Sequence, residues 1–136
     1  MRYLGIDYGA KRIGIAMSDD AAGFAFPKET IPNDTSAIDR IATIVKAEGV
    51  GGIIIGDARA LNGEKNPITR EAEAFGTSLG THVRVPVYPS WEAWSSVEAA
   101  RFSPKGGLHN DASAAAIILQ RYLDTLQPRD VDESLE

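Results

Sequence analysis

Cysteine is absent from the chain, which excludes a disulfide scaffold, a thiolate metal site and a cysteine nucleophile. No apolar run approaches the ~20 residues that a membrane-spanning helix needs. The opening residues Met1–Gly5 lack the apolar core of a secretory signal, so we expect a cytoplasmic protein with no membrane partner. Hydrophobic residues make up 43% of the chain and charged residues 24%, which is typical of a globular protein, and 136 residues allow one domain.

A net positive charge is also absent, because the formal net charge is −5. This value argues against a nucleic-acid partner only at first sight. Four of the 19 acidic residues lie in the last seven positions, so the other 15 nearly balance the 14 Lys and Arg. Net charge therefore leaves the class of partner open, and a local basic patch remains compatible with the composition.

Alternating and helical hydrophobic patterns divide the chain into strands and helices. Residues 2–7 and 12–18 are predicted to be strands joined by a tight turn, and a third strand is expected within 23–31. Ile38, Ile41, Ile44 and Val45 predict a helix that begins near Thr35 or Ser36 and ends at Gly49. The run Gly52–Ile55 is typical of a strand buried on both faces. The remaining predictions are a polar loop over 57–67, a helix over 68–79, a strand over 82–88, a short helix over 95–101 and a helix over 110–125.

This order of elements predicts an α/β fold with a mixed five-stranded sheet and helices on both faces. Its first three strands are antiparallel, and helices and strands then alternate. Residues 1–127 are expected to form one domain, and the acidic tail 128–136 is expected to be disordered.

Two aspartates occupy positions that suit chemistry. Asp7 ends the first predicted strand, beside Gly9 and the basic pair Lys11–Arg12, which would suit a phosphate-bearing ligand. Asp111 opens the last helix. Each also has an ordinary structural role open to it, since Asp caps turns and stabilises helix N-termini. If the fold brings the two carboxylates together, their repulsion favours a cation between them.

The stretch Leu4-Gly-Ile-Asp-Tyr-Gly-Ala-Lys-Arg-Ile-Gly-Ile-Ala-Met-Ser-Asp19 resembles the opening of the YqgF family. The resemblance continues through Ile53–Gly56, Leu61–Gly63, Val97–Ala99 and Asp111–Gln120, and covers about residues 1–125. Members of this family are RuvC-like proteins with a ribonuclease H fold, described as Holliday-junction resolvases or pre-16S rRNA nucleases. The resemblance therefore implies a single ribonuclease H-like nuclease domain.

The family's acidic triad falls on Asp7, Glu92 and Asp111, and the resemblance implies a two-metal site for Mg²⁺ or Mn²⁺. The family's Asp-Glu-Arg motif reads Trp91-Glu92-Ala93 here, and its Gly-Leu-Pro segment reads Gly56-Asp57-Ala58. These departures leave catalytic competence open. Asp57 is a candidate additional metal ligand, although capping the loop or pairing with Arg59 would also explain it.

The resemblance implies structured RNA or branched DNA as the substrate, and the sequence leaves that choice open. Lys11, Arg12, Arg101 and Lys105 are the candidate phosphate contacts, while the roles of Trp91, Trp94 and His109 stay open.

The leading function is a metal-dependent endonuclease. The alternative is a catalytically weakened relative that binds nucleic acid or protein. An actin-like ATPase has a similar first strand, but such a protein needs two lobes to enclose ATP, and 136 residues supply only one. Both a monomer and a homodimer are compatible with the sequence.

Overall fold

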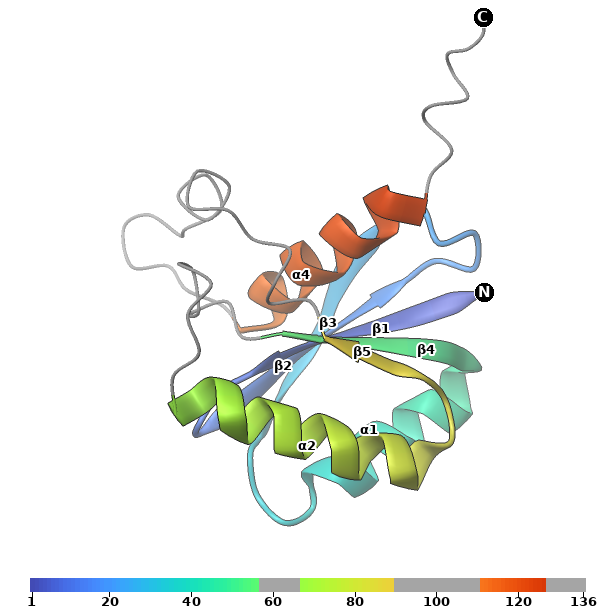
Figure 1. Ribbon diagram of the computed structural model, residues 1–136. Coiled ribbons are helices and arrows are strands. Elements are labelled where there is room, and N and C mark those ends of the chain that lie inside the picture. Colours follow the sequence, from blue (N-terminus) through green and yellow to red (C-terminus); the bar gives the residue numbers. More distant parts are fainter. Residues whose placement is uncertain (57–66, 90–110, 127–136) are drawn as a thin grey trace, which may run out of the picture.

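The structure is a computed structural model that describes residues 1–56, 67–89 and 111–126. A five-stranded sheet in the order β3-β2-β1-β4-β5 forms its centre (Figure 1). The strands are β1 (Arg2–Tyr8), β2 (Arg12–Ser18), β3 (Ala25–Pro32), β4 (Val50–Gly56) and β5 (Val87–Pro89). The helices are α1 (Ala37–Glu48), α2 (Pro67–Val83) and α4 (Asp111–Leu126). Strands β1, β2 and β3 pair antiparallel, whereas β4 and β5 run parallel to β1. The predicted mixed sheet is confirmed.

The two faces of the sheet are covered by different helices. Helices α1 and α2 lie on one face and α4 lies on the other (Figure 1). Successive side chains of a strand point to opposite faces, and on β1 Leu4, Ile6 and Tyr8 pack into the cluster under α1 and α2. Tyr3 packs into the cluster under α4. By the same alternation, Gly5 and Asp7 belong to the α4 face.

Helix α1 forms as its sequence predicts. Its hydrophobic face buries Ile41 and Val45, and the helix stops at Gly49, which adopts a left-handed conformation with φ of 66°. Ser36 occupies the N-cap position, although its side chain makes no capping hydrogen bond. The predicted strand in the Gly52–Ile55 run is β4, and it is buried on both faces.

The boundary between α2 and β5 differs from the prediction. The helix continues to Val83, and only Val87–Pro89 form a strand, so the predicted strand over 82–88 is wrong at its start and the helix over 68–79 was predicted too short. Arg84 ends the helix in a left-handed conformation with φ of 63°, a position that usually requires glycine. Val83, Val85 and Val87 alternate as strand residues do, but only Val87 lies in β5, while Val83 is the last residue of α2. All three pack against the core under α2.

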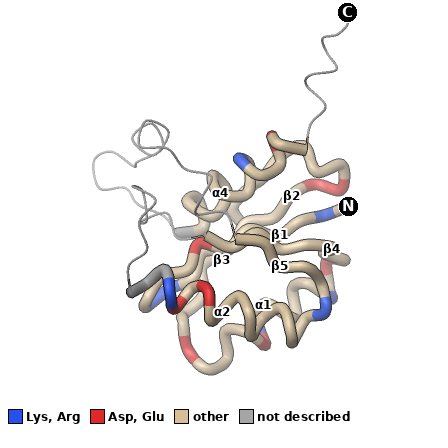
Figure 2. Tube along the Cα trace, in the orientation of Figure 1, with Lys and Arg blue, Asp and Glu red and all other residues tan. Residues whose placement is uncertain are grey.

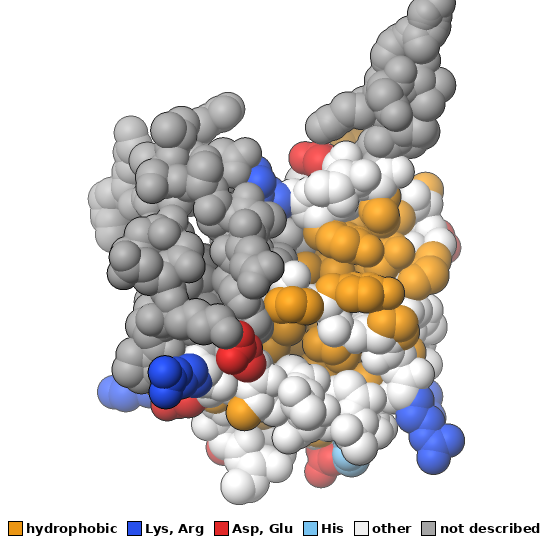
Figure 3. Space-filling view, in the orientation of Figure 1, with side chains coloured by type: hydrophobic (Ala, Val, Ile, Leu, Met, Phe, Trp, Pro, Cys, Tyr) orange, Lys and Arg blue, Asp and Glu red, His pale blue; other side chains and the backbone are white. Residues whose placement is uncertain are grey.

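An apolar surface lies between α4 and the sheet edge at β5 (Figure 3). Three tyrosines from β1, β5 and α4 contact one another: the rings of Tyr88 and Tyr122 stack with centroids 6.0 Å apart, and the ring centroid of Tyr3 lies 5.5 Å from that of Tyr122. Burial together with the neighbouring phenols raises the pKa of Tyr122 above its ordinary value. No helix within the described ranges is long and apolar enough to cross a membrane.

Candidate active site

Asp7 is the penultimate residue of β1 and is one of two buried polar residues in the described part of the chain, with 7% of its surface exposed. It pairs with Gly14 of β2 on one side and with Gly56, the last residue of β4, on the other. Both residues directly opposite Asp7 on the neighbouring strands are thus glycines. Asp7 therefore lies at the edge where the parallel strands end, which is where α/β sheets bind ligands.

Helix α4 lies antiparallel to β1. Its residue Tyr122 contacts Tyr3 near the beginning of the strand. Two residues further along β1, Gly5 lies under Ala115 and Leu119. Each two-residue step along a strand covers ~6.6 Å, which corresponds to about four residues of helix. Asp7, two residues beyond Gly5, therefore lies opposite the first turn of α4.

The first residue of α4 is Asp111. The fold thus brings Asp7 and the position of Asp111 to the same end of the β1–α4 layer, although the Asp111 side chain lies outside what the structure describes. A helix N-terminus carries partial positive charge, which favours carboxylates at this position. This arrangement fits the hard oxygen donor set that Mg²⁺ and Mn²⁺ prefer.

The position of α4 is fixed by close contacts along its length. Gln120 accepts a hydrogen bond from the Ala25 backbone N–H at 2.8 Å and donates one to the Gly23 carbonyl at 3.0 Å. At Gly5 the helix is so close that a Cβ atom would lie 2.7 Å from Leu119 Cβ. These contacts hold the helix against β1 and the start of β3, and so determine where its first turn lies.

Several predicted site residues lie outside the described ranges. They are Asp57, Glu92, Arg101 and Lys105, together with Trp91, Trp94 and His109. The assignment of Glu92 and Asp57 as metal ligands therefore stays a prediction. Among the side chains that the structure does describe, no three His, Cys, Asp or Glu gather closely enough to hold a metal ion.

Lys11 and Arg12, the predicted phosphate contacts, are exposed where β1 turns into β2, and their role in binding stays a prediction. One basic residue, Arg70, lies in the first turn of α2, and the start of this helix lies on the same side of the molecule as the β1–β2 turn (Figure 2). Contact between the rings of Tyr8 and Phe75, 5.1 Å apart, brings the end of β1 close to α2. Asn33, which no sequence pattern singles out, hydrogen bonds to this turn from the end of β3. Its position directly after Pro32, the last residue of β3, is the one sequence feature that could have pointed to Asn33.

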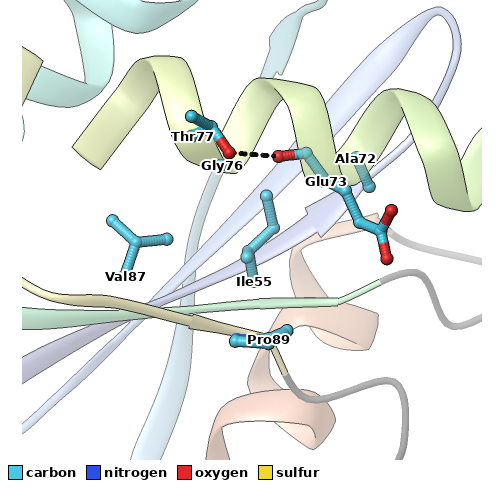
Figure 4. Close-up of a pocket in the computed structure, with 7 residues that line it drawn as sticks. All are labelled: Ile55, Ala72, Glu73, Gly76, Thr77, Val87 and Pro89. Atoms are coloured by element: carbon cyan, nitrogen blue, oxygen red, sulfur yellow. Dashed lines mark hydrogen bonds between the residues drawn. The ribbon is translucent and has the colours of Figure 1, made fainter. Parts of the chain in front are cut away.

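A cavity of about 280 Å³ lies between α2 and strands β4 and β5 (Figure 4). Ile55, Ala72, Gly76 and Val87 give it apolar walls, and Glu73 contributes a carboxylate. Ile55 belongs to the cluster under α1 and α2. The cavity therefore lies on the opposite face of the sheet from Asp7, and Glu73 is not part of the carboxylate pair. His82, predicted to begin a strand, instead lies in the last turn of α2, with Nε2 3.3 Å from Asp39 Oδ1.

Comparison with solved structures defines the class of the fold. The structure of T. thermophilus RuvC in complex with a Holliday junction substrate matches with a TM-score of 0.55 at 15% sequence identity, and the match covers 93% of this chain and 95% of that one. The fowlpox virus Holliday junction resolvase matches with a TM-score of 0.51 at 12% identity. At these identities the likeness shows the fold alone: the chain has the RuvC-like, ribonuclease H-type α/β fold.

Sequence comparison identifies the family. Residues 1–125 match the family model described as "RuvX: Holliday junction resolvase". A protein of Oleidesulfovibrio alaskensis is 35% identical, with 95% of this chain and 96% of its own length covered. A protein of Bordetella pertussis is 36% identical, with 90% and 93% covered. Both carry the name "Putative pre-16S rRNA nuclease". The chain belongs to the RuvX (YqgF) family, and the resemblance seen in the sequence is confirmed.

Proposed function

We propose that this protein is a cytoplasmic, divalent-metal-dependent endonuclease that hydrolyses phosphodiester bonds in structured nucleic acid. Its family includes relatives named for pre-16S rRNA, and its fold is that of a resolvase seen with a Holliday junction. The observation that carries the proposal is the antiparallel packing of α4 on β1, which brings Asp7 and Asp111 to one end of the layer.

Asp7, Asp111 and Glu92 are the residues that would hold Mg²⁺ or Mn²⁺. When bound, such ions stabilise the charge that develops on the attacking and leaving oxygens of a phosphodiester. Asp7 suits this role because it is buried on a central strand, which fixes its position. Lys11 and Arg12 are exposed at the turn that follows, where they would hold a phosphate that is not cleaved.

A cleavage panel tests the proposal. The purified protein is incubated with a four-way DNA junction and with a 16S rRNA fragment carrying a 5′ extension, each with Mg²⁺, Mn²⁺ or EDTA. We expect cleavage of at least one substrate that depends on the metal. Asp7→Asn should reduce the rate by at least about 100-fold, because even residues that only support metal ligands cost 10- to 100-fold. Circular dichroism checks that the variant remains folded.

The matched control is Asp39→Asn. Asp39 is an exposed aspartate of α1 whose contact with His82 is solvent-accessible, so its loss should leave cleavage unchanged. Binding without cleavage of either substrate would favour the catalytically weakened relative, for which the altered motif at Trp91-Glu92-Ala93 is the specific reason. A solution mass measurement completes the test, because resolving a junction requires two active sites and processing an RNA end requires one.

A further inference from the structure

The turn between β1 and β2 is held by a residue from a distant part of the chain. The Asn33 side-chain amide donates a hydrogen bond to the Gly9 carbonyl at 2.8 Å. Its backbone N–H donates a second to the Lys11 carbonyl at 2.9 Å. Asn33 therefore contacts the turn on both sides of Ala10. A connection held at two points keeps fewer conformations than one joined only to its own strands.

The second of these bonds extends the sheet past a proline. Pro32 pairs with Arg12 in the register of β2 and β3. Because proline has no backbone N–H, it cannot donate to the neighbouring strand. Asn33 is the next residue with a donor, and it reaches the carbonyl of Lys11.

The residues that follow Asn33 are linked by hydrogen bonds to the start of α1. Asp34 Oδ1 accepts hydrogen bonds from the backbone N–H of Ser36 at 2.9 Å and from its hydroxyl at 2.6 Å. The Arg40 side chain donates to the same hydroxyl at 2.9 Å. The segment 33–36 thus links the first turn of α1 to the β1–β2 turn, so the turn is supported by a rigid element.

This turn presents Lys11, whose side chain is exposed and pairs with no carboxylate in the described ranges. The turn follows Tyr8, the last residue of β1, so its shape is tied to the end of the strand that carries Asp7. We propose that Asn33 is a positioning residue that holds the β1–β2 turn in the shape in which Lys11 contacts a substrate phosphate. This inference rests on the proposed function.

Binding of a fluorescein-labelled four-way DNA junction and of the 5′-extended rRNA fragment, in EDTA and over a range of salt concentrations, tests it. For Lys11→Ala we expect a roughly three- to tenfold rise in Kd and a loss of about one unit from the salt slope, as for one lost phosphate contact. Asn33→Ala should change both quantities in the same direction. The double variant should bind no more weakly than Lys11→Ala alone, because Asn33 acts through the turn.

Three controls separate positioning from a general structural effect. Asn33→Leu roughly keeps the size of the side chain, removes the amide donor and adds no charge, so it should behave like Asn33→Ala. Thr35→Ala changes an exposed residue of the same connection and should leave Kd unchanged. Arg70→Ala removes an exposed cation of α2, so any effect it has should multiply with that of Asn33→Ala. Thermal unfolding of each variant shows whether it remains folded at the assay temperature.

The inference is overturned if Asn33→Ala matches Thr35→Ala in Kd and salt slope, or if the effects of Asn33→Ala and Lys11→Ala multiply fully. It is also overturned if the wild type binds neither nucleic acid. Failure of the proposed function gives a different result. In that case the wild type binds but does not cleave with Mn²⁺, and the binding data still decide the role of Asn33.

Discussion

Asp7 pairs directly with Gly56 in the parallel register of β1 and β4. Adjacent strands lie ~4.8 Å apart, so Gly56 lies directly beside Asp7 at the end of β4. The next residue in the sequence is Asp57, where the family usually has leucine. Asp57 lies outside the described residues, and its part in the metal site stays a prediction.

Asp57→Asn should weaken Mn²⁺ binding more than Asp19→Asn does, if Asp57 takes part in the metal site. Asp19 is a suitable comparison because it lies in the β2–β3 turn, at the opposite end of the sheet from Asp7. Calorimetric titration of Mn²⁺ into each variant measures the difference. Equal and negligible effects of the two substitutions would assign Asp57 to the loop alone.

Asp19 itself should make stability depend on pH. Its carboxylate accepts hydrogen bonds from the backbone N–H groups of Phe24 at 3.1 Å and Gly23 at 2.9 Å, which lower its pKa below the ordinary value of 3.8. A group whose pKa is lowered by folding stabilises the fold above its unfolded pKa, and that contribution disappears as the pH falls through the folded value.

Urea unfolding at pH 7 and at several values below 4 measures this effect. We expect wild type to be more stable than Asp19→Asn at pH 7, and the difference to shrink steadily below pH 3.8. Asp39→Asn, which changes an aspartate more exposed and outside this turn, serves as the comparison. A wild-type advantage that stayed constant across this range would mean that the charge of Asp19 is not the cause.

Much of the fold could be predicted because its signals are local. The buried run before Gly56 predicts β4, and the apolar spacing that ends at Gly49 predicts α1. The end of α2 could not be predicted, because Arg84 adopts a glycine-like conformation without being glycine. Packing of Val83 against the core determines where the helix ends, and no local sequence pattern indicates that packing.

The candidate site shows the same division. Asp7 could be identified from its place after an apolar strand and before a tight turn, and Asp111 from its place at a helix start. Their common location depends on how α4 lies on β1, and the spacing in the sequence does not give that direction. Asn33 was missed because its amide bonds to a backbone carbonyl 24 residues away, and such a contact leaves no periodic pattern.

The only two tryptophans flank Glu92, so tryptophan emission can report on the third predicted metal ligand. If Glu92 binds the ions, adding Mn²⁺ to the wild type should change the emission of Trp91 and Trp94. Glu92→Gln should weaken that response, because an amide is a poorer ligand for a hard cation than a carboxylate. An identical titration in wild type and Glu92→Gln would remove Glu92 from the metal site.

Two glycines at opposite faces of the sheet should respond oppositely to alanine. A Cβ atom on Gly76 of α2 would lie 3.5 Å from Ile55 and 3.7 Å from Val87, which is ordinary contact. Since alanine favours a helix over glycine, Gly76→Ala should raise the free energy of unfolding by about 0.5–1 kcal/mol. Cleavage should be unchanged, because the added methyl group lies on the face away from Asp7.

A Cβ atom on Gly5 would lie 2.7 Å from Leu119 Cβ and 2.9 Å from the Ala115 carbonyl oxygen, so α4 must move away from β1. Overpacking of this kind costs about 1–3 kcal/mol. Because α4 begins at Asp111, the same movement would displace that residue from Asp7, and cleavage should fall further than the loss of folded protein explains. Urea unfolding and cleavage rates at a temperature where Gly5→Ala is fully folded measure the two effects separately. Full activity in folded Gly5→Ala would show that the close approach of α4 serves stability alone.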